Sequence, residues 1–160
     1  MIDEAHRRLV AEINSESAQN YFLELARRNA KARGLTVSFE GLYFQGRKAE
    51  PELKSQTPFV IAQDAESLRK LKEGILEGLI FEIGCIGEIR NGVIRPEHIN
   101  FCKVYSEKMY SFIINRSPIH YFGKSTDAGT KYEGEWRVPV DTFKDMSESG
   151  TFQLIRIYHE

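Results

Sequence analysis

The residues best suited to chemistry lie between Tyr110 and Thr126, in the segment YSFIINRSPIHYFGKST. Two short apolar runs flank Arg116-Ser117-Pro118, and the second run ends in Gly123-Lys124-Ser125-Thr126. If two strands deliver a histidine, a lysine and two hydroxyl groups to one loop, that loop can bind an anion or perform acid–base catalysis. This segment is therefore the first candidate site.

The tripeptide Gly123-Lys124-Ser125 matches the end of a nucleotide-binding phosphate loop, whose full pattern is GxxxxGK[ST]. Such a loop needs a glycine five residues before Gly123, so that backbone N–H groups can curl around the phosphates. Pro118 occupies that position and has no N–H to donate. The sequence therefore argues against this type of loop and favours a turn between strands at Gly123.

The same segment resembles the GIY-YIG nuclease family, in which two short strands carry tyrosine triplets. Tyr110-Ser111-Phe112 would stand for the first triplet and Tyr121-Phe122-Gly123 for the second. The resemblance implies a phosphodiester-cleaving site with an arginine, a glutamate and a metal ion. Both triplets depart from the family pattern, and Lys131 or Arg137 would have to replace the arginine. We therefore assign no family from the sequence.

A looser hypothesis is a small nuclease or related hydrolase that works without a metal ion. Two histidines can serve as base and acid while a cation stabilises the charged phosphorane. The residues assigned to these roles are His120 and His159 as the histidines, Lys124 as the cation and Ser125 as the orienting hydroxyl, with Arg116 and Tyr121 as alternatives to the last two. On a strand, however, Tyr121 faces away from His120.

Large aromatic side chains in the second half of the chain predict a protein-binding surface. Exposed aromatic residues and arginines dominate the binding energy of protein interfaces. The candidates are Arg116, Tyr121, Tyr132 and Trp136. The alternative is that most of these rings fill the core of a sheet, and the sequence leaves both interpretations open.

A basic cluster offers a different surface. Arg27 and Lys31 share one face of a predicted helix, with Arg28 and Arg33 beside them. Such a cluster can bind nucleic-acid phosphates, because backbone contacts need only charge and reach. Glu24 on the same helix and the lack of interleaved aromatic residues favour a solvated helix face instead.

Length and composition indicate a single domain over residues 1–160. Lysine and arginine number 22 against 23 acidic residues, so the net charge of −1 gives no general attraction for nucleic acid or an anionic membrane. No apolar run is long enough to span a membrane, and the N-terminus lacks the layout of a signal peptide. Cys85 and Cys102 are too few for a disulfide framework and too far apart for a CxxC redox pair, and a metal site would have to recruit His98 and further ligands from elsewhere. We expect a cytoplasmic protein without a cofactor or a bound metal.

The elements that must position these residues begin with helices. Residues 1–34 have helical periodicity and end at Gly34, as one helix or as two, and these helices could also mediate self-association. Another helix is predicted from Asp64 to about Glu77, with Gly78 ending it.

The rest of the body, residues 35–160, predicts mostly strands. Pro58, near the start of the apolar run Thr57–Ala62, predicts an edge strand, and Asn91-Gly92 is typical of a tight hairpin turn. Further strands are predicted at Leu35–Gln45, Ile99–Tyr105, Tyr110–Asn115, Ile119–Phe122, Trp136–Val140 and Phe152–His159. Consecutive strands joined by tight turns indicate antiparallel pairing.

These elements predict an α+β domain in which an N-terminal helical element packs on a mostly antiparallel sheet with one further helix. The sequence shows no cofactor loop, no metal cluster and no nucleophile beside a base. The leading hypothesis is therefore a non-enzymatic binding protein that acts on another protein, as an inhibitor, immunity-type or adaptor module. The metal-independent nuclease centred on His120 and Lys124 is the alternative.

Overall fold

The computed structural model describes residues 4–105, 118–139 and 145–157. The predicted strand Tyr110–Asn115 and the candidate residues Arg116 and His159 lie outside these described residues. Among the residues that are described, no helix is both long and apolar enough to cross a membrane.

The N-terminal element consists of two helices, α1 (Glu4–Ile13) and α2 (Glu16–Ala32). Ser15 separates them, because its side-chain oxygen accepts a hydrogen bond from the backbone N–H of Ala18 and so begins a new helix. Helix α2 then ends close to Gly34, as the sequence predicts.

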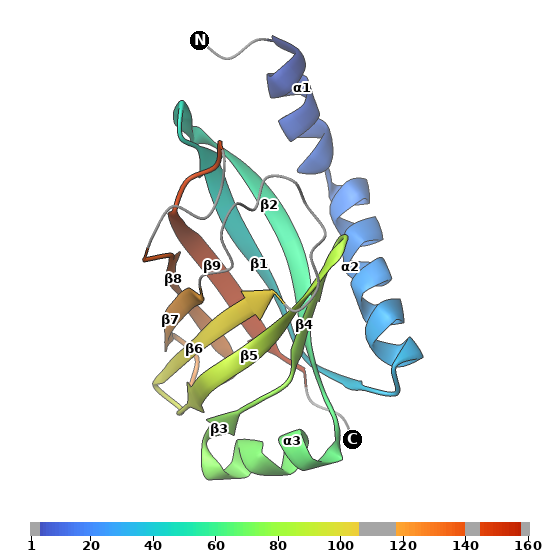
Figure 1. Ribbon diagram of the computed structural model, residues 1–160, viewed down its shortest axis with the longest axis vertical. Helices are drawn as coiled ribbons and strands as arrows, with labels where there is room; N and C mark the ends of the chain where they lie inside the picture. Colours follow the sequence, from blue (N-terminus) through green and yellow to red (C-terminus); the bar gives the residue numbers. More distant parts are fainter. Residues whose placement is uncertain (1–3, 106–117, 140–144, 158–160) are drawn as a thin grey trace.

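The strands close into a barrel (Figure 1). The described residues contain β1 (Thr36–Arg47), β2 (Glu50–Gln63), β3 (Ile75–Leu76), β4 (Leu79–Glu82), β5 (Cys85–Ile94), β6 (His98–Tyr105), β7 (Ile119–Ser125), β8 (Lys131–Arg137) and β9 (Ser149–Arg156). Eight of them pair antiparallel in the order β1, β2, β4, β5, β6, β7, β8, β9, and β9 pairs back with β1. The two-residue β3 is added to β5.

The predicted architecture, a helical element packed on a sheet, is therefore wrong in its central feature. The sheet is a closed eight-stranded barrel, and the helices are additions to it. An open sheet would leave two unpaired edges, and closure removes both. Closure depends on the pairing of β1 with β9, which come from opposite ends of the strand-rich body, so local sequence patterns do not reveal it.

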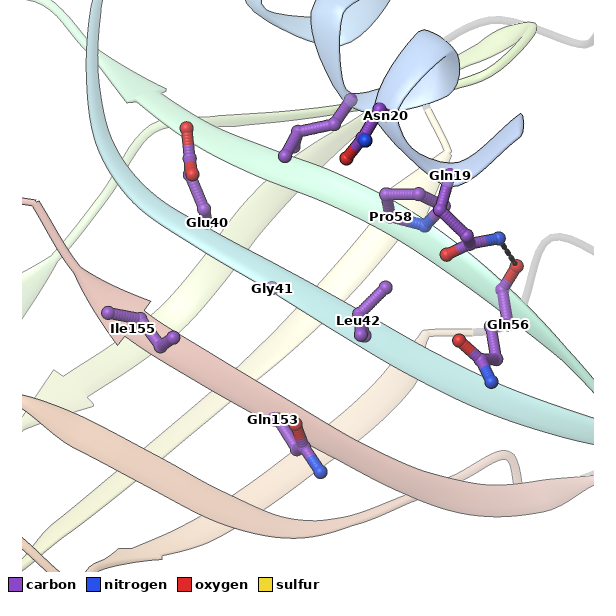
Figure 2. Close-up of a pocket in the computed structure, with 10 residues that line it drawn as sticks. Gln19, Asn20, Glu40, Gly41, Leu42, Gln56, Pro58, Gln153 and Ile155 are labelled. Carbon is purple, nitrogen blue, oxygen red and sulfur yellow. Dashed lines mark hydrogen bonds between the residues drawn. The ribbon is translucent and has the colours of Figure 1, made fainter. Parts of the chain in front are cut away.

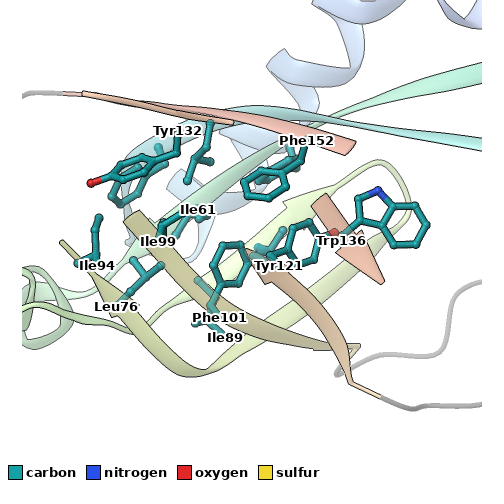
Figure 3. Packing of buried hydrophobic residues seen from close by; sticks show 14 of the residues in the cluster. Ile61, Leu76, Ile89, Ile94, Ile99, Phe101, Tyr121, Tyr132, Trp136 and Phe152 are labelled. Atoms are coloured by element: carbon teal, nitrogen blue, oxygen red, sulfur yellow. The ribbon is translucent and has the colours of Figure 1, made fainter. Parts of the chain in front are cut away.

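Side chains fill the barrel interior (Figure 3). Every strand of the ring contributes to one buried cluster. The rings of Phe101 and Tyr121 stack with their centroids 4.8 Å apart, and Phe152 meets Tyr121 edge-on at 5.2 Å. An eight-stranded barrel has an interior just wide enough for such packing, so most of the lumen is core rather than channel.

Helix α2 lies along the outside of the barrel over β2 and β4 (Figure 1). Its Ala26 and Ala30 are buried against Val60 of β2 and Phe81 of β4, which point outward from the barrel. The small alanine side chains let the helix approach the sheet closely. This contact forms a second apolar cluster that is separate from the interior one.

One end of the barrel is covered by the segment that follows β2. Helix α3 (Ala65–Lys70) continues as the 3-10 turn η1 (Leu71–Glu73), and Leu71 packs into the interior core. The helix predicted to reach Glu77 is therefore too long. It stops at Gly74, whose φ of 81° is left-handed and incompatible with a continuing helix.

Asn91-Gly92 does not form the predicted hairpin turn. Both residues lie inside β5, where Asn91 has a φ of 55° and the register with β6 shifts, which is the signature of a β-bulge. The hairpin lies instead at Ile83-Gly84, between β4 and β5, where Gly84 has a φ of 74°. Bulges and tight turns both require positive φ, so Asn-Gly fits either one.

The barrel wall is short beside the β4–β5 turn. The last pair between β2 and β4 joins Phe59 to Glu82, whereas β2 continues back to Glu50 with β1 as its partner. Pro58 marks the point at which β2 loses its second neighbour. The edge position predicted for Thr57–Ala62 therefore holds only at its start, because Phe59 to Ala62 pair with β1 on one side and with β4 on the other.

Candidate functional site

A buried ion pair lies inside the barrel at the level where β4 ends. Lys103 of β6 is 1% exposed and Glu82 of β4 is 3% exposed. The Nζ atom of Lys103 donates a hydrogen bond to Oε2 of Glu82 over 3.1 Å. Charged side chains are almost never buried this deeply unless they are paired, so the pair marks the part of the interior most suited to a function.

Three more donors converge on the Glu82 carboxylate. The hydroxyls of Tyr43 and Tyr105 donate to its Oε1 over 2.9 and 3.1 Å. The thiol of Cys85 donates to the same oxygen over 3.0 Å. Together with Lys103 these groups give the carboxylate four donors, so its charge is fully hydrogen-bonded.

Tyrosine rings surround the Lys103 ammonium. Its Nζ lies 4.7 Å from the ring centroids of both Tyr43 and Tyr105, and 5.4 Å from that of Tyr121. Rings at these distances attract a cation through their quadrupoles. The aliphatic stem of Lys103 runs over Gly87, where a Cβ atom would lie 2.7 Å from the lysine Cγ. Glycine at this position therefore makes room for the stem.

Burial and charge shift the pKa values of this cluster. Burial raises the pKa of Tyr43 and Tyr105 well above its ordinary value, and the Glu82 charge adds to the effect. Burial also raises the pKa of Tyr121. For Lys103, burial alone lowers the pKa, but the Glu82 charge and the contact with Tyr121 outweigh it and raise the pKa. All four groups therefore keep their protons at neutral pH.

A pocket of about 690 Å³ opens beside this cluster, at the short side of the barrel wall. Tyr43 and Glu82 line its inner part, next to the backbone of Gly84. Ser55 and Thr57 of β2 line it along the strand half that lacks a second neighbour. The pocket thus connects the buried polar cluster with the outside of the barrel.

Most of the remaining pocket wall is apolar. Ile13 and Phe22 come from the two helices, Ile83 from the β4–β5 turn and Met146 from the segment before β9. Polar side chains of His6, Gln45, Arg47 and Asp145 complete the lining. A mostly apolar cavity with a few fixed polar groups at the mouth of a barrel is a common form of small-molecule site.

The arrangement is better suited to binding than to acid–base chemistry. A general base needs a lone pair that can reach the substrate, and a general acid needs a pKa near the working pH. The Glu82 oxygens already accept from four donors, and the raised pKa values of Lys103 and the tyrosines keep their protons in place. The cluster is a fixed polar wall.

The first candidate site of the sequence lies on the opposite side of the sheet. His120, Phe122 and Lys124 alternate with buried residues along β7 and face solvent, where they line a shallow hollow of about 600 Å³. His120 and Lys124 are four residues apart on a strand, which separates their Cα atoms by about 13 Å. Phe122, 49% exposed, stands between them. His120 and Lys124 therefore share one face of the sheet but lie too far apart to act on the same reacting group.

The other sequence candidates occupy different environments. Tyr121, Tyr132 and Trp136 are buried inside the barrel, so the interpretation of them as an exposed contact surface is wrong and the core alternative holds. The Ser125 hydroxyl accepts hydrogen bonds from the backbone N–H groups of Asp127 and Gly129 and stabilises the β7–β8 turn. Arg116 and His159 lie outside the described residues.

Gly123 is not a turn residue. It lies inside β7 opposite Gly134 of β8, and a Cβ atom there would come within 2.9 Å of the Phe152 ring. The glycine therefore makes room for a core side chain. Tyr121, part of the triplet that resembles the GIY-YIG pattern, points into the same core, while Tyr110-Ser111-Phe112 lies outside the described residues.

The basic cluster on α2 is largely engaged within the protein. Arg27 makes a bidentate pair with Glu40 of β1, over 2.6 and 2.9 Å. Arg28 pairs with Glu24 one helical turn away, over 3.3 Å. Arg33 lies over the Phe81 ring at 5.7 Å. These contacts favour the solvated helix face over a phosphate-binding surface.

A second hollow lies outside the barrel, between α2 and strands β1 and β9 (Figure 2). Leu42 and Ile155 form part of its floor. The Gln19 amide donates to the backbone oxygens of Ile13 and Gln56, which fastens α2 to β2. The hollow of about 270 Å³ is the smaller of the two apolar ones, and it contains no buried ion pair.

Sequence reasoning missed Glu82 and Lys103, although β6 carried a signal. Ile99, Phe101 and Lys103 occupy successive inward positions, so the lysine breaks an otherwise apolar row. Glu82 likewise follows the buried run of β4. A charge on the buried face of a strand predicts a buried partner of opposite charge, but the sequence does not say which residue that is.

The described residues contain no group of three or more histidine, cysteine or acidic side chains that could hold a metal ion. Comparison with known proteins adds no functional assignment. No family model, no curated protein and no solved structure matches the chain.

Proposed function

We propose that the protein is a non-enzymatic binding protein whose barrel takes a small, mostly apolar molecule in the pocket beside Glu82 and Lys103. One observation carries the proposal: a cavity of about 690 Å³ reaches a buried, fully hydrogen-bonded polar cluster through the short side of the barrel wall. The far end of the barrel is covered by α3 and η1. A barrel with one covered end and a cavity near the other is a suitable container for such a ligand.

The composition of the wall supports an apolar ligand. Phe22, Ile83 and Met146 offer apolar surface to the pocket, each from a different element. A ligand that covers such surface is stabilised by roughly 25 cal/mol for each Å² removed from water. The hydroxyl of Tyr43, held against Glu82, offers a polar group of fixed orientation at the inner end.

Filling the pocket should abolish ligand binding. Ser55 lines the pocket from β2, and a Ser55→Phe substitution would place a ring in the cavity. We expect the affinity for an apolar fluorescent probe, measured by titration, to fall at least about tenfold because ring and probe compete for one space. Lys54→Phe is the matched control, because Lys54 is the exposed neighbour of Ser55 on β2 and its side chain points to the opposite side of the strand.

The same pair of variants decides the proposal. Equal probe affinity in wild type, Ser55→Phe and Lys54→Phe would show that the probe binds elsewhere and that the pocket is not the site. Thermal unfolding of each variant should be followed in parallel, because overpacking a strand residue costs about 1–3 kcal/mol and must not unfold the protein.

The exposed face of β6, β7 and β8 supports a second candidate function, binding to another protein. Phe122 is 49% exposed and stacks against His98, with the ring centroids 6.4 Å apart. His120, Lys124 and Glu135 surround it on the same face. An aromatic anchor within a polar rim is the usual form of an interface hot spot.

If this face binds a partner protein, Phe122→Ala should weaken the complex by at least about 2 kcal/mol, the cost of losing a hot spot. The measurement is affinity capture followed by titration with the purified partner. Ile155→Ala, which removes a similarly exposed apolar side chain from β9, is the control. A complex that tolerates Phe122→Ala would place the contact on another surface.

A further inference from the structure

We infer that the ligand of the barrel pocket is an amphipathic anion, with an apolar body and a carboxylate head that pairs with Arg47. The inference rests on the proposed function and specifies the class of ligand. It is based on the charged side chains that line the pocket and that have no ion-pair partner within the described part of the protein.

Arg47 lies on the inward side of β1. Tyr43, Gln45 and Arg47 occupy alternate positions of the strand, and all three line the pocket. Tyr43 stands at the inner end and Arg47 at the outer end, about 13 Å away along the strand. A ligand that spans this length would place its apolar body against Phe22 and Met146 and its head at Arg47.

The neighbouring charges have partners within the protein. Lys103 pairs with Glu82 inside the barrel, Lys48 pairs with Glu148 over 3.0 Å, and Arg7 pairs with Glu50. Within the described residues, Arg47 forms no ion pair. A half-buried guanidinium beside an apolar cavity is therefore available to a ligand.

One acidic side chain besides Glu82 also lines the pocket. Asp145 lies at its rim and is exposed, whereas Arg47 is half-buried. Solvent screens an exposed charge more strongly than a half-buried one, so Arg47 contributes more to the binding of a charged head. A planar guanidinium also matches a carboxylate with two parallel hydrogen bonds, which an ammonium group cannot do.

The test compares three ligands with the same apolar tail: octanoate, octanol and octylammonium, each titrated calorimetrically into the full chain. We expect octanoate to bind most tightly. Arg47→Gln should weaken octanoate about ten- to a hundredfold, the size of a lost charge-assisted hydrogen bond, and leave octanol unchanged. Lys48→Gln removes the same charge from the adjacent residue, whose partner is Glu148, and should change octanoate affinity less than about twofold.

The outcomes separate the two proposals. One outcome would be that octanol binds as tightly as octanoate and that Arg47→Gln has no effect, while Ser55→Phe still abolishes binding. The pocket would then be the binding site, but the inference that its ligand is an anion would be wrong. Preference for octylammonium would assign the head-group contact to Asp145 and also overturn the inference. If no ligand binds, both proposals fail. If Arg47→Gln does not fold, Arg47→Lys takes its place, because it keeps the positive charge. The affinity of Arg47→Lys for octanoate must then lie between the affinity of the wild-type protein for octanoate and its affinity for octanol.

Discussion

Replacing Lys103 by alanine is expected to lower the free energy of unfolding by about 3–5 kcal/mol, because it leaves the buried Glu82 carboxylate without its counter-charge. The substitution also removes the lysine stem that packs over Gly87. The measurement is chemical denaturation at neutral pH, with the slope of the transition checked for two-state behaviour. Lys124→Ala, which removes an exposed lysine from the adjacent strand, should change the free energy by less than about 0.5 kcal/mol.

A double substitution separates the charge from the packing. Lys103→Met with Glu82→Gln removes both charges and keeps most of the volume, so it should be more stable than either single variant. The tyrosine hydroxyls can still donate to the glutamine oxygen. A loss below about 1 kcal/mol for Lys103→Ala would mean that water or another cation compensates Glu82, and the cluster would then be more accessible than its burial indicates.

Net stability alone does not explain why the Glu82–Lys103 ion pair is present. A buried ion pair contributes little net stability compared with well-packed apolar residues, because desolvation offsets most of the attraction. An interior filled only by residues like Phe101 and Ile99 would be simpler. The cluster instead fixes Tyr43 and Glu82 as the inner wall of the pocket. We propose that this positioning of Tyr43 and Glu82 offsets the cost of removing the Glu82 and Lys103 charges from water.

The sequence predicted local features of the fold and failed on long-range ones. The helical N-terminus and the strand at Ile99–Tyr105 follow from periodicity, and the structure confirms both. Barrel closure joins residues such as Phe44 and Thr151, whose pairing has no local signature. The hairpin turn predicted at Asn91-Gly92 was wrong for another reason. A β-bulge also requires positive φ, so this dipeptide fits a bulge as well as a turn.

The candidate site was harder to predict than the fold. Chemistry-bearing residue types gathered in the segment ending at Thr126, yet alternation along β7 sends His120 and Lys124 to the solvent and Tyr121 to the core. Strand alternation predicts this separation of His120 from Tyr121, and the structure confirms it. The partnership of Glu82 with Lys103 would not have followed, because the two residues lie on β4 and β6, the two neighbours of β5, and meet over Gly87 only through the register of three strands.

Alkaline pH should unfold the protein more steeply than a single titrating group would allow. Lys103, Tyr43, Tyr105 and Tyr121 all have a raised pKa in the folded state. In the unfolded chain, tyrosine and lysine release their protons near pH 10. The folded state therefore binds more protons than the unfolded state above about pH 10, and stability is lost as pH rises further.

The expected slope follows from the number of groups. Each group that keeps its proton only in the folded state reduces the free energy of unfolding by about 1.4 kcal/mol per pH unit. Denaturation curves at successive alkaline pH values measure this slope, and tyrosinate absorbance shows when the buried hydroxyls ionise. Tyr105→Phe removes one titrating group and should make the slope shallower by about that amount. If all tyrosines ionise together near pH 10 while the fold persists, the cluster is solvated, and the fixed inner wall on which the binding proposal depends is lost.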